Sequence, residues 1–179
     1  MTRVCLIGED DLTLRYELLS RETARGALAT YDLDEPYRNT VAVETVSLGA
    51  AVALCNDLDW YLARFVDAAL ILEPSISEVE WFSRDLATAV RDDHVDPAET
   101  GRFLRVYGVE REDGGRASDD GGREEATQNE PGEDSDADRT PQLVEPMLVT
   151  RTGETIPEYD LRDVEDTLRI RVTEAEFDA

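Results

Sequence analysis

Short apolar segments that alternate with helix-like segments are the main pattern along this chain. A short apolar run that ends in a turn, or a segment in which apolar and polar residues alternate, predicts a β-strand. Six segments fit one of these two patterns. They are residues 3–8, 39–47, 68–72, 103–110, 143–151 and 167–174.

Apolar residues at helical spacing predict helices between the first four of these strands. Asp11 and Ser47 stand at N-cap positions before the first two helices. A capping box of Ser75 and Glu78 precedes the third. The predicted helices cover residues 12–30, 48–65 and 76–90.

The alternation of strand and helix predicts an α/β fold with a mostly parallel central sheet, flanking helices and right-handed crossovers, similar to the flavodoxin-like order. The last two predicted strands form a C-terminal β-hairpin. Pro146 in the first of them fits an edge strand or a bulge. In the second, Leu168, Ile170 and Val172 share one face. Because a lone hairpin is marginal in water, it must pack on the preceding domain or on a partner chain.

Composition divides the chain into three parts. Residues 112–140 contain no aliphatic or aromatic side chain larger than alanine and proline and are rich in Asp, Glu and Gly. Such a segment has no apolar area to bury, so we expect a disordered acidic linker. The expected organisation is an α/β domain at 1–111, this linker at 112–140, and a strand pair at 141–179.

Charge excludes several activities and suggests an environment. The chain has 42 acidic residues, 18 Arg and no Lys, with a formal net charge of −24. A phosphate-binding loop that uses Lys and a Schiff-base mechanism are therefore excluded. The composition resembles that of haloarchaeal proteins, whose charge is screened at high salt. Mimicry of DNA by an acidic surface is an alternative interpretation.

Other compositional features narrow the class of protein. No basic patch supports direct binding of nucleic acid, and no apolar run is long enough to span a membrane. The N-terminal residues lack the order of a secretory signal, so we expect a cytoplasmic protein. Cys5 and Cys55 lie in apolar settings and predict buried free thiols. One histidine, His94, excludes a multi-histidine metal site.

One acidic constellation could carry chemistry. Glu9, Asp10 and Asp11 follow the first predicted strand, and Glu73 follows the third. Ligand sites in parallel sheets form beyond the carboxyl ends of the strands. If the two strands are parallel neighbours, these carboxylates meet at one edge, where they could hold Mg²⁺. In the alternative, Asp11 caps a helix and the other carboxylates are solvated surface.

The same order resembles the receiver domains of two-component signalling. The matching segments are VCLIGEDD and AALILEPSISEVEWFSRDL, within residues 3–87. The resemblance implies a degenerate receiver without phosphotransfer, because Glu73 stands at the position of the phosphoacceptor aspartate and the family's lysine has no counterpart. The chain also resembles an uncharacterised haloarchaeal family in YELLSRETARGALATYDLDEPYRN and LGAAVALCNDLDWYLARF. That resemblance implies no activity and no site residues.

Two aromatic and two basic residues are candidates for contact with a partner. Trp60 and Trp81 lie in predicted helices, where exposed aromatic side chains would favour an interface. Arg169 and Arg171 occupy the polar face of the last strand and could bind an anion or pair with nearby acids. We expect a non-catalytic protein-interaction or regulatory protein, with no catalytic residues and no cofactor. A ligand-binding protein or small enzyme that uses Mg²⁺ at the acidic cluster is the alternative.

Overall fold

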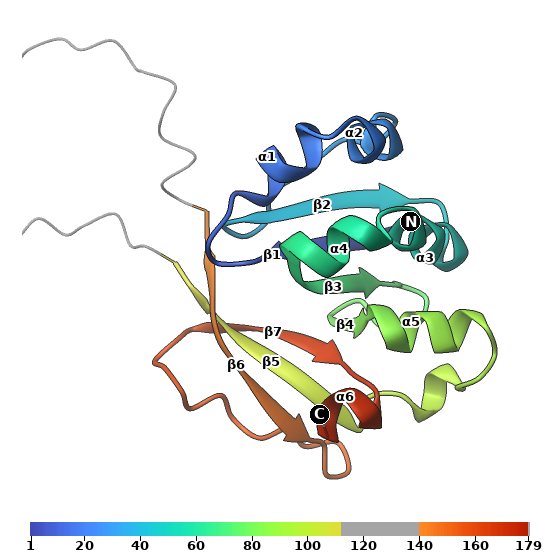
Figure 1. Ribbon diagram of the computed structural model, residues 1–179. Helices are drawn as coiled ribbons and strands as arrows, with labels where there is room; N and C mark the ends of the chain where they lie inside the picture. Colours follow the sequence, from blue (N-terminus) through green and yellow to red (C-terminus); the bar gives the residue numbers. More distant parts are fainter. Residues whose placement is uncertain (112–139, 179) are drawn as a thin grey trace, which may run out of the picture.

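Seven strands form one sheet in the order β2-β1-β3-β4-β7-β5-β6 (Figure 1). The computed structural model describes residues 1–111 and 140–178, so most of the predicted linker lies outside the described residues. The strands are β1 Thr2–Gly8, β2 Thr40–Thr45, β3 Val66–Leu72, β4 Glu80–Ser83, β5 Phe103–Glu110, β6 Gln142–Thr150 and β7 Asp166–Arg171. The helices are α1 Leu14–Leu19, α2 Glu22–Leu28, α3 Leu48–Asp57, α4 Asp59–Phe65, α5 Arg84–Arg91 and α6 Glu174–Asp178, with a 3-10 turn at Pro97–Glu99.

The expectation of a mostly parallel sheet was wrong. Every neighbouring pair of strands in this sheet is antiparallel except β4 and β7. The connection from β1 to β2 contains two short helices and then returns to the end where it began, so that Ile7 pairs with Thr40. Helices α3 and α4 do join two strands of the same direction, β2 and β3, but β1 lies between them. This arrangement also differs from the parallel sheet that the receiver resemblance implied.

The expected C-terminal hairpin was also wrong, because β6 and β7 do not pair with each other. Both pair with β5, one on each side, and β7 also pairs with β4. Thus β7 is an interior strand that joins the two halves of the sheet. Its predicted alternation is confirmed, since Leu168 and Ile170 are buried. Pro146 lies on the edge strand β6 beside an irregularity in its register with β5.

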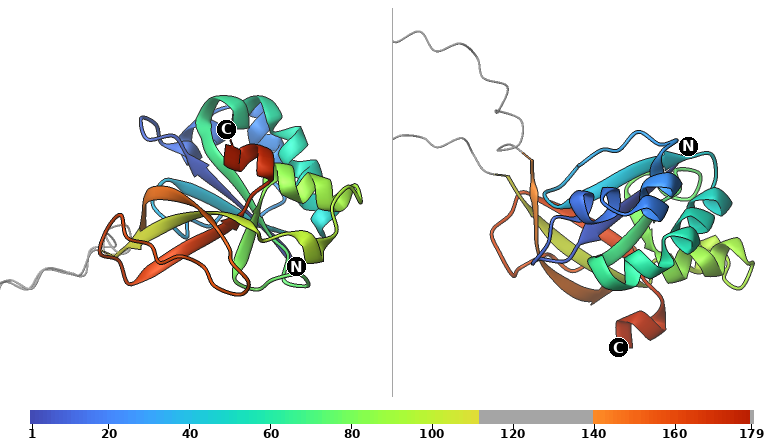
Figure 2. Two further views of the ribbon diagram at one scale, coloured as in Figure 1. Left: turned by 90° about the horizontal axis from the view of Figure 1, so that it is seen from below. Right: turned by 45° about the horizontal axis from the view of Figure 1, so that its top comes forward.

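Apolar side chains gather on both faces of the sheet. Helices α1–α5 cover one face of the half of the sheet that consists of β2, β1, β3 and β4 (Figures 1 and 2). Leu14, Val52 and Phe82 are buried there. On the other face, side chains from distant strands form a second cluster, which includes Cys5, Leu70, Trp81, Tyr107, Leu168, Ile170 and Val172. Cys5 and Cys55 are buried free thiols in different clusters, which confirms their predicted state.

One of the two predicted single-residue helix caps is present in the structure. The predicted cap at Ser47 is confirmed, since its Oγ accepts a hydrogen bond from the Ala50 N–H at 3.1 Å. The predicted cap at Asp11 was wrong: the Leu14 N–H at the start of α1 donates to Asn39 Oδ1 at 2.8 Å. Asn39 adopts a left-handed conformation, with φ 59°, that asparagine tolerates better than most residues. A contact distant in sequence thus replaces the local cap.

The third predicted helix begins later than its capping box suggests. Residues 80–83 form the buried strand β4, and α5 begins at Arg84 with Ser83 as its cap. The apolar residues from Ile76 onward have helical spacing, but those from residue 80 onward belong first to strand β4 and then to helix α5. No helix in the described part of the chain is long and apolar enough to cross a bilayer.

Candidate functional site

The structure separates the acidic residues that the sequence analysis placed at one edge. Strands β1 and β3 are neighbours, but they are antiparallel, with Gly8 close to Val66. Residues 9–11 therefore follow one end of this pair, whereas Glu73 follows the other. At ~3.3 Å per residue, the two ends lie about 20 Å apart. The four carboxylates do not converge, which corrects the geometry expected for Glu9, Asp10, Asp11 and Glu73.

Glu73 has a local role instead. Its carboxylate accepts hydrogen bonds from the Thr2 hydroxyl and, at 3.1 and 2.7 Å, from the backbone N–H and hydroxyl of Ser75. Burial alone would raise the pKa of Glu73, but the hydrogen bonds from Thr2 and Ser75 outweigh burial and lower it. Within residues 1–111 and 140–178, no group of three or more His, Cys, Asp or Glu side chains is arranged to hold a metal ion.

Glu9 and Asp10 line a cavity of about 480 Å³ where β1 and β5 end and β6 begins. Tyr107 also lines it, and its hydroxyl donates a hydrogen bond of 3.3 Å to Asp67. Burial, supported by the Asp67 charge, raises the pKa of Tyr107 to about 12, so the phenol stays protonated near neutral pH. Arg162 pairs with Glu110 and Glu145 at 3.1 and 3.6 Å in the same lining. The Tyr107 hydroxyl and the Arg162 guanidinium thus both have carboxylate partners within the lining.

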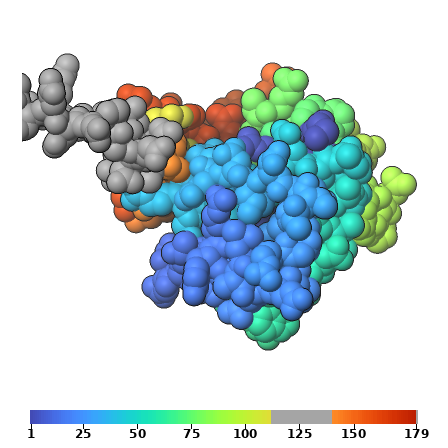
Figure 3. Space-filling view, turned by 90° about the horizontal axis from the view of Figure 1, so that it is seen from above, coloured from blue at the N-terminus to red at the C-terminus, as the bar shows by residue number. Residues whose placement is uncertain are grey.

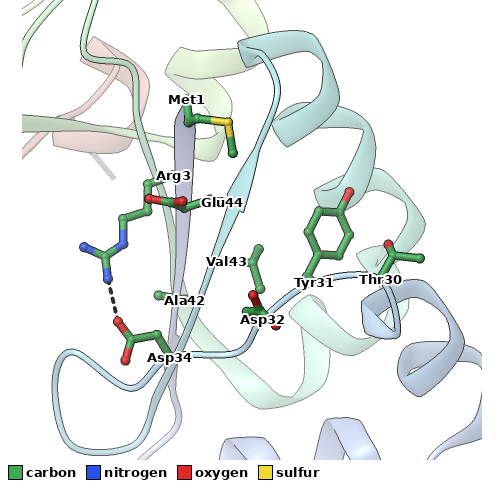
Figure 4. Close-up of a pocket in the computed structure, with 9 residues that line it drawn as sticks. All are labelled: Met1, Arg3, Thr30, Tyr31, Asp32, Asp34, Ala42, Val43 and Glu44. Carbon is green, nitrogen blue, oxygen red and sulfur yellow. Dashed lines mark hydrogen bonds and ion pairs between the residues drawn. The ribbon is translucent and has the colours of Figure 1, made fainter.

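A second cavity, of about 390 Å³, lies beside the outer edge of β2 (Figure 4). Arg3 and Asp34 face each other there and form an ion pair of 2.9 Å. The Asp34 backbone also exchanges two hydrogen bonds with Ala42, which covers part of the β2 edge. The Arg3–Asp34 ion pair and these backbone hydrogen bonds thus attach the segment before β2 to strands β1 and β2.

The four predicted contact residues have different surroundings. Trp81 is buried in the second apolar cluster, at 7% exposed, and is not available to a partner. Arg171 pairs with Glu80 at 2.8 Å, which is not one of the nearby acids expected from the sequence. Arg169 is exposed on β7. Trp60, on α4, is 50% exposed and remains a candidate for partner contact.

Trp60 is the centre of a group of aromatic and arginine side chains that we name the Trp60 surface. The Arg64 guanidinium carbon lies 3.8 Å from the centre of the Trp60 ring. The ring centres of Tyr61 and Phe65 lie 5.0 and 6.2 Å from the ring centre of Trp60, and both rings meet it edge to face. Arg21 lies 4.8 Å from the Phe65 ring. The Trp60 surface consists of Arg21, Trp60, Tyr61, Arg64 and Phe65.

Helix positions and hydrogen bonds hold this surface in place. Trp60 and Arg64 are one helical turn apart on α4, and the Arg64 Nη1 donates to the Trp60 carbonyl at 3.1 Å. Arg21 lies at the start of α2, where it pairs with Glu17 at 3.1 Å. Helices α1 and α4 are in contact, and Figure 3 shows the blue α1–α2 segment beside the teal segment of α3 and α4. A half-exposed indole is thus fixed beside two guanidinium groups.

Sequence reasoning found Trp60 but missed its arginine neighbours. The spacing of Trp60 and Arg64 by four residues was a readable signal for contact on a helix. Arg21 is separated from Trp60 by 39 positions, and only the packing of the helices brings its guanidinium carbon to 5.9 Å from the Trp60 ring.

Comparison with known proteins gives one match. A model of a family described as a family of unknown function (DUF5804) matches residues 2–109. This range contains the whole Trp60 surface and strands β1–β4, but neither β6 nor β7. No curated protein and no solved structure matches the chain.

Proposed function

We propose that this chain, which belongs to the family of unknown function DUF5804, is a non-catalytic protein-interaction protein that binds its partner through the Trp60 surface. The observation that carries this proposal is that Trp60 on α4 is 50% exposed, although the guanidinium groups of Arg64 on the same helix and of Arg21 before α2 lie near its ring. Trp, Tyr and Arg are the residues most enriched where alanine substitution weakens protein complexes.

The fixed geometry of the surface supports binding. Arg64 stacks on the Trp60 ring, so the orientations of both side chains are restricted before a partner arrives. Contacts that form between restricted side chains lose less conformational entropy on binding. The surface thereby offers a partner the exposed half of the indole at low entropic cost.

The two guanidinium groups indicate the chemistry of the partner. Arg64 directs its guanidinium to the Trp60 ring and carbonyl, and Arg21 has one carboxylate neighbour, Glu17. A partner segment with a carboxylate beside an apolar or aromatic side chain would satisfy both the guanidinium and the ring. Charge-assisted pairs of this kind are stronger than neutral hydrogen bonds.

Substitution of Trp60 tests the proposal. We expect Trp60→Ala to weaken partner binding by about 2 kcal/mol, or about 30-fold. The side chain is half exposed, so the protein should remain folded by circular dichroism. The measurement is affinity capture from native lysate by tagged wild type and variant, followed by identification of the captured protein and titration of that purified protein.

Tyr16→Ala is the matched control, because Tyr16 is an exposed aromatic residue, at 69%, on α1. It should capture the same protein as wild type. Equal binding by wild type and Trp60→Ala would overturn the proposal. Self-association of wild type in sedimentation velocity that Trp60→Ala abolishes would identify the partner as a second copy of the chain.

We also propose that the protein works in the cytoplasm of a haloarchaeon, because of its net charge of −24 and its use of Arg alone as a strong base. Carboxylates that repel one another at low salt are screened when the Debye length falls from ~10 Å at 0.1 M to ~3 Å at 1 M. Screening should therefore favour the compact state.

Thermal unfolding at several concentrations of KCl tests this setting. We expect the Tm to rise between 0.1 and 3 M KCl, by about 2–4 °C for each kcal/mol gained. A Tm that stays constant or falls with KCl would contradict the proposal, because repulsion among 42 carboxylates would then not limit stability.

A further inference from the structure

Three charged side chains link β4, β7 and the residue that follows β6, at the end of the sheet where β6 and β7 end and β5 begins. Figure 1 shows these strand ends. Glu80 on β4 accepts a hydrogen bond of 2.8 Å from Arg171 Nε and a second one from Arg151 Nη2. Arg171 also donates to the Thr100 hydroxyl at 2.9 Å. The side chains of Glu80, Arg171 and Arg151 are 8%, 14% and 20% exposed.

The charges in this group do not balance. Two guanidinium groups share one carboxylate, although acidic residues outnumber arginines 42 to 18 in the whole chain. A buried charge is costly unless an opposite charge and hydrogen bonds compensate it. One positive charge therefore remains without a buried counter-charge, and Arg151 Nε is a buried donor without a hydrogen-bond partner among the described residues.

A cavity of about 380 Å³ lies beside Arg151, and Arg171 is not part of its lining. Arg151, Arg102, Thr100 and Gly101 line it. Gly101 has φ 97°, and a Cβ there would lie 3.1 Å from Arg151 Nη1 and 3.2 Å from Arg171 Nε. The glycine thus allows the backbone to lie directly against both guanidinium groups. The cavity volume falls within the range of ~300–1,000 Å³ found for small-molecule sites.

We propose that this cavity binds a phosphate-type oxyanion, either inorganic phosphate or the phosphate group of a phosphomonoester. Arg151 and Arg102 supply the positive charge at the cavity, and the planar guanidinium fork matches the oxygens of phosphate. The anion compensates the excess charge of the Glu80 group. Glu99, which also lines the cavity, opposes binding and limits affinity. The site uses none of the residues of the Trp60 surface and does not depend on the function proposed above.

Titration of inorganic phosphate, glycerol phosphate and acetate into the full-length protein tests the site, by calorimetry at an ionic strength held constant with KCl. We expect saturable binding of phosphate or glycerol phosphate, and Arg151→Gln should weaken it about tenfold or more through loss of a charge-assisted bond. Arg151→Gln keeps the Glu80–Arg171 pair, so it should remain folded. Arg102→Gln should also weaken binding.

Two further variants make the outcome specific. Glu99→Gln should tighten binding severalfold, because it removes the opposing charge at the cavity. Arg169→Gln removes an exposed arginine on β7 and should leave the affinity unchanged. Tighter binding of glycerol phosphate than of phosphate would identify a phosphomonoester as the ligand, and the reverse order would identify inorganic phosphate.

Three results would overturn the proposal. They are the absence of saturable binding for both phosphate compounds, equal binding of acetate, and equal loss of affinity in Arg151→Gln and Arg169→Gln. The last result would show a general effect of net charge rather than a site at the cavity.

Discussion

A chain that ends at Arg111 should lose cooperative folding. In the described structure β5 pairs with β6 and β7, and β7 is the strand that connects β5 to β4. The shortened chain keeps β5 but removes both of its neighbours. It also removes Leu168, Ile170 and Val172 from the second apolar cluster.

The expected loss is comparable to the whole net stability of a typical domain. Burial of three aliphatic side chains contributes about 5–9 kcal/mol, at ~1.5–3 kcal/mol each. A typical domain has a net stability of only ~5–15 kcal/mol, and the strand pairings of β7 are lost as well. We therefore expect the far-ultraviolet circular dichroism of residues 1–111 to show no cooperative transition in urea.

A point substitution tests the same conclusion within the full chain. Ile170 is 1% exposed on β7, and Ile170→Ala should lower the free energy of unfolding by about 2–5 kcal/mol. Arg169→Gln, at the neighbouring exposed position, should change it by less than about 0.5 kcal/mol. If residues 1–111 unfold cooperatively with the urea dependence of the full chain, β7 is not part of the folding unit and this interpretation is wrong.

The family match ends before the strands that complete the sheet. The matched range, 2–109, contains β5 except for its last residue, and neither of the strands that pair with β5. We therefore expect that the matched range does not fold on its own in this chain. Residues 140–178 complete the sheet rather than forming an appendage that docks on it.

The strands could be predicted from the sequence because their signal is local. The fourth predicted strand, 103–110, has the same bounds as β5, and the alternation of Leu168 and Ile170 identified the buried face of β7. Local patterns report which side of a strand is buried, because successive side chains point to opposite faces. They carry no information about which strand lies alongside.

The direction of the strands depended on contacts that no local pattern contains. The chain from β1 to β2 returns to its starting end, where Asn39 holds both sides of the turn through bonds to the Leu14 N–H and the Glu9 carbonyl. A single helix would have produced a crossover instead. Because the expected acidic edge depended on parallel strands, this one difference also separated Glu73 from residues 9–11.

The two proposed sites differ in how much of them the sequence could indicate. Trp60 and Arg64 are close in sequence, so the centre of the Trp60 surface could partly be predicted from the sequence. The Glu80 group consists of Glu80, Arg151 and Arg171, which come from three segments that are distant in sequence. Arg171 was predicted to bind an anion or to pair with nearby acids, whereas the carboxylate that it contacts lies 91 positions away in the sequence.

Replacement of Glu80 by glutamine should have the second large effect, a loss of about 3–5 kcal/mol in the free energy of unfolding at neutral pH. Glutamine keeps the shape of the side chain but leaves Arg151 and Arg171 without their buried counter-charge. Burial by itself would raise the pKa of Glu80, but the hydrogen bonds and charges of Arg171 and Arg151 outweigh it, so the folded-state pKa lies below the ordinary value of 4.5.

The contribution of Glu80 to the free energy of unfolding should decrease at acidic pH. Because the folded-state pKa of Glu80 is lowered, its contribution to stability is complete above pH ~4.5 and is lost as the pH falls through the folded-state pKa. The difference in unfolding free energy between wild type and Glu80→Gln should therefore be constant from pH 7 to 5 and shrink at lower pH. Urea unfolding of both proteins at each pH measures this difference.

Glu78→Gln is the control for net charge, since Glu78 is exposed and lies two residues before Glu80. It removes the same negative charge and relieves the same general repulsion, but leaves the buried group intact, so its unfolding free energy should stay within about 0.5 kcal/mol of wild type. If Glu80→Gln were as stable as Glu78→Gln at pH 7, the buried pairs would contribute no net stability. The two arginines would then be compensated without Glu80, and the charge imbalance that supports an anion at the neighbouring cavity would have to be rejected.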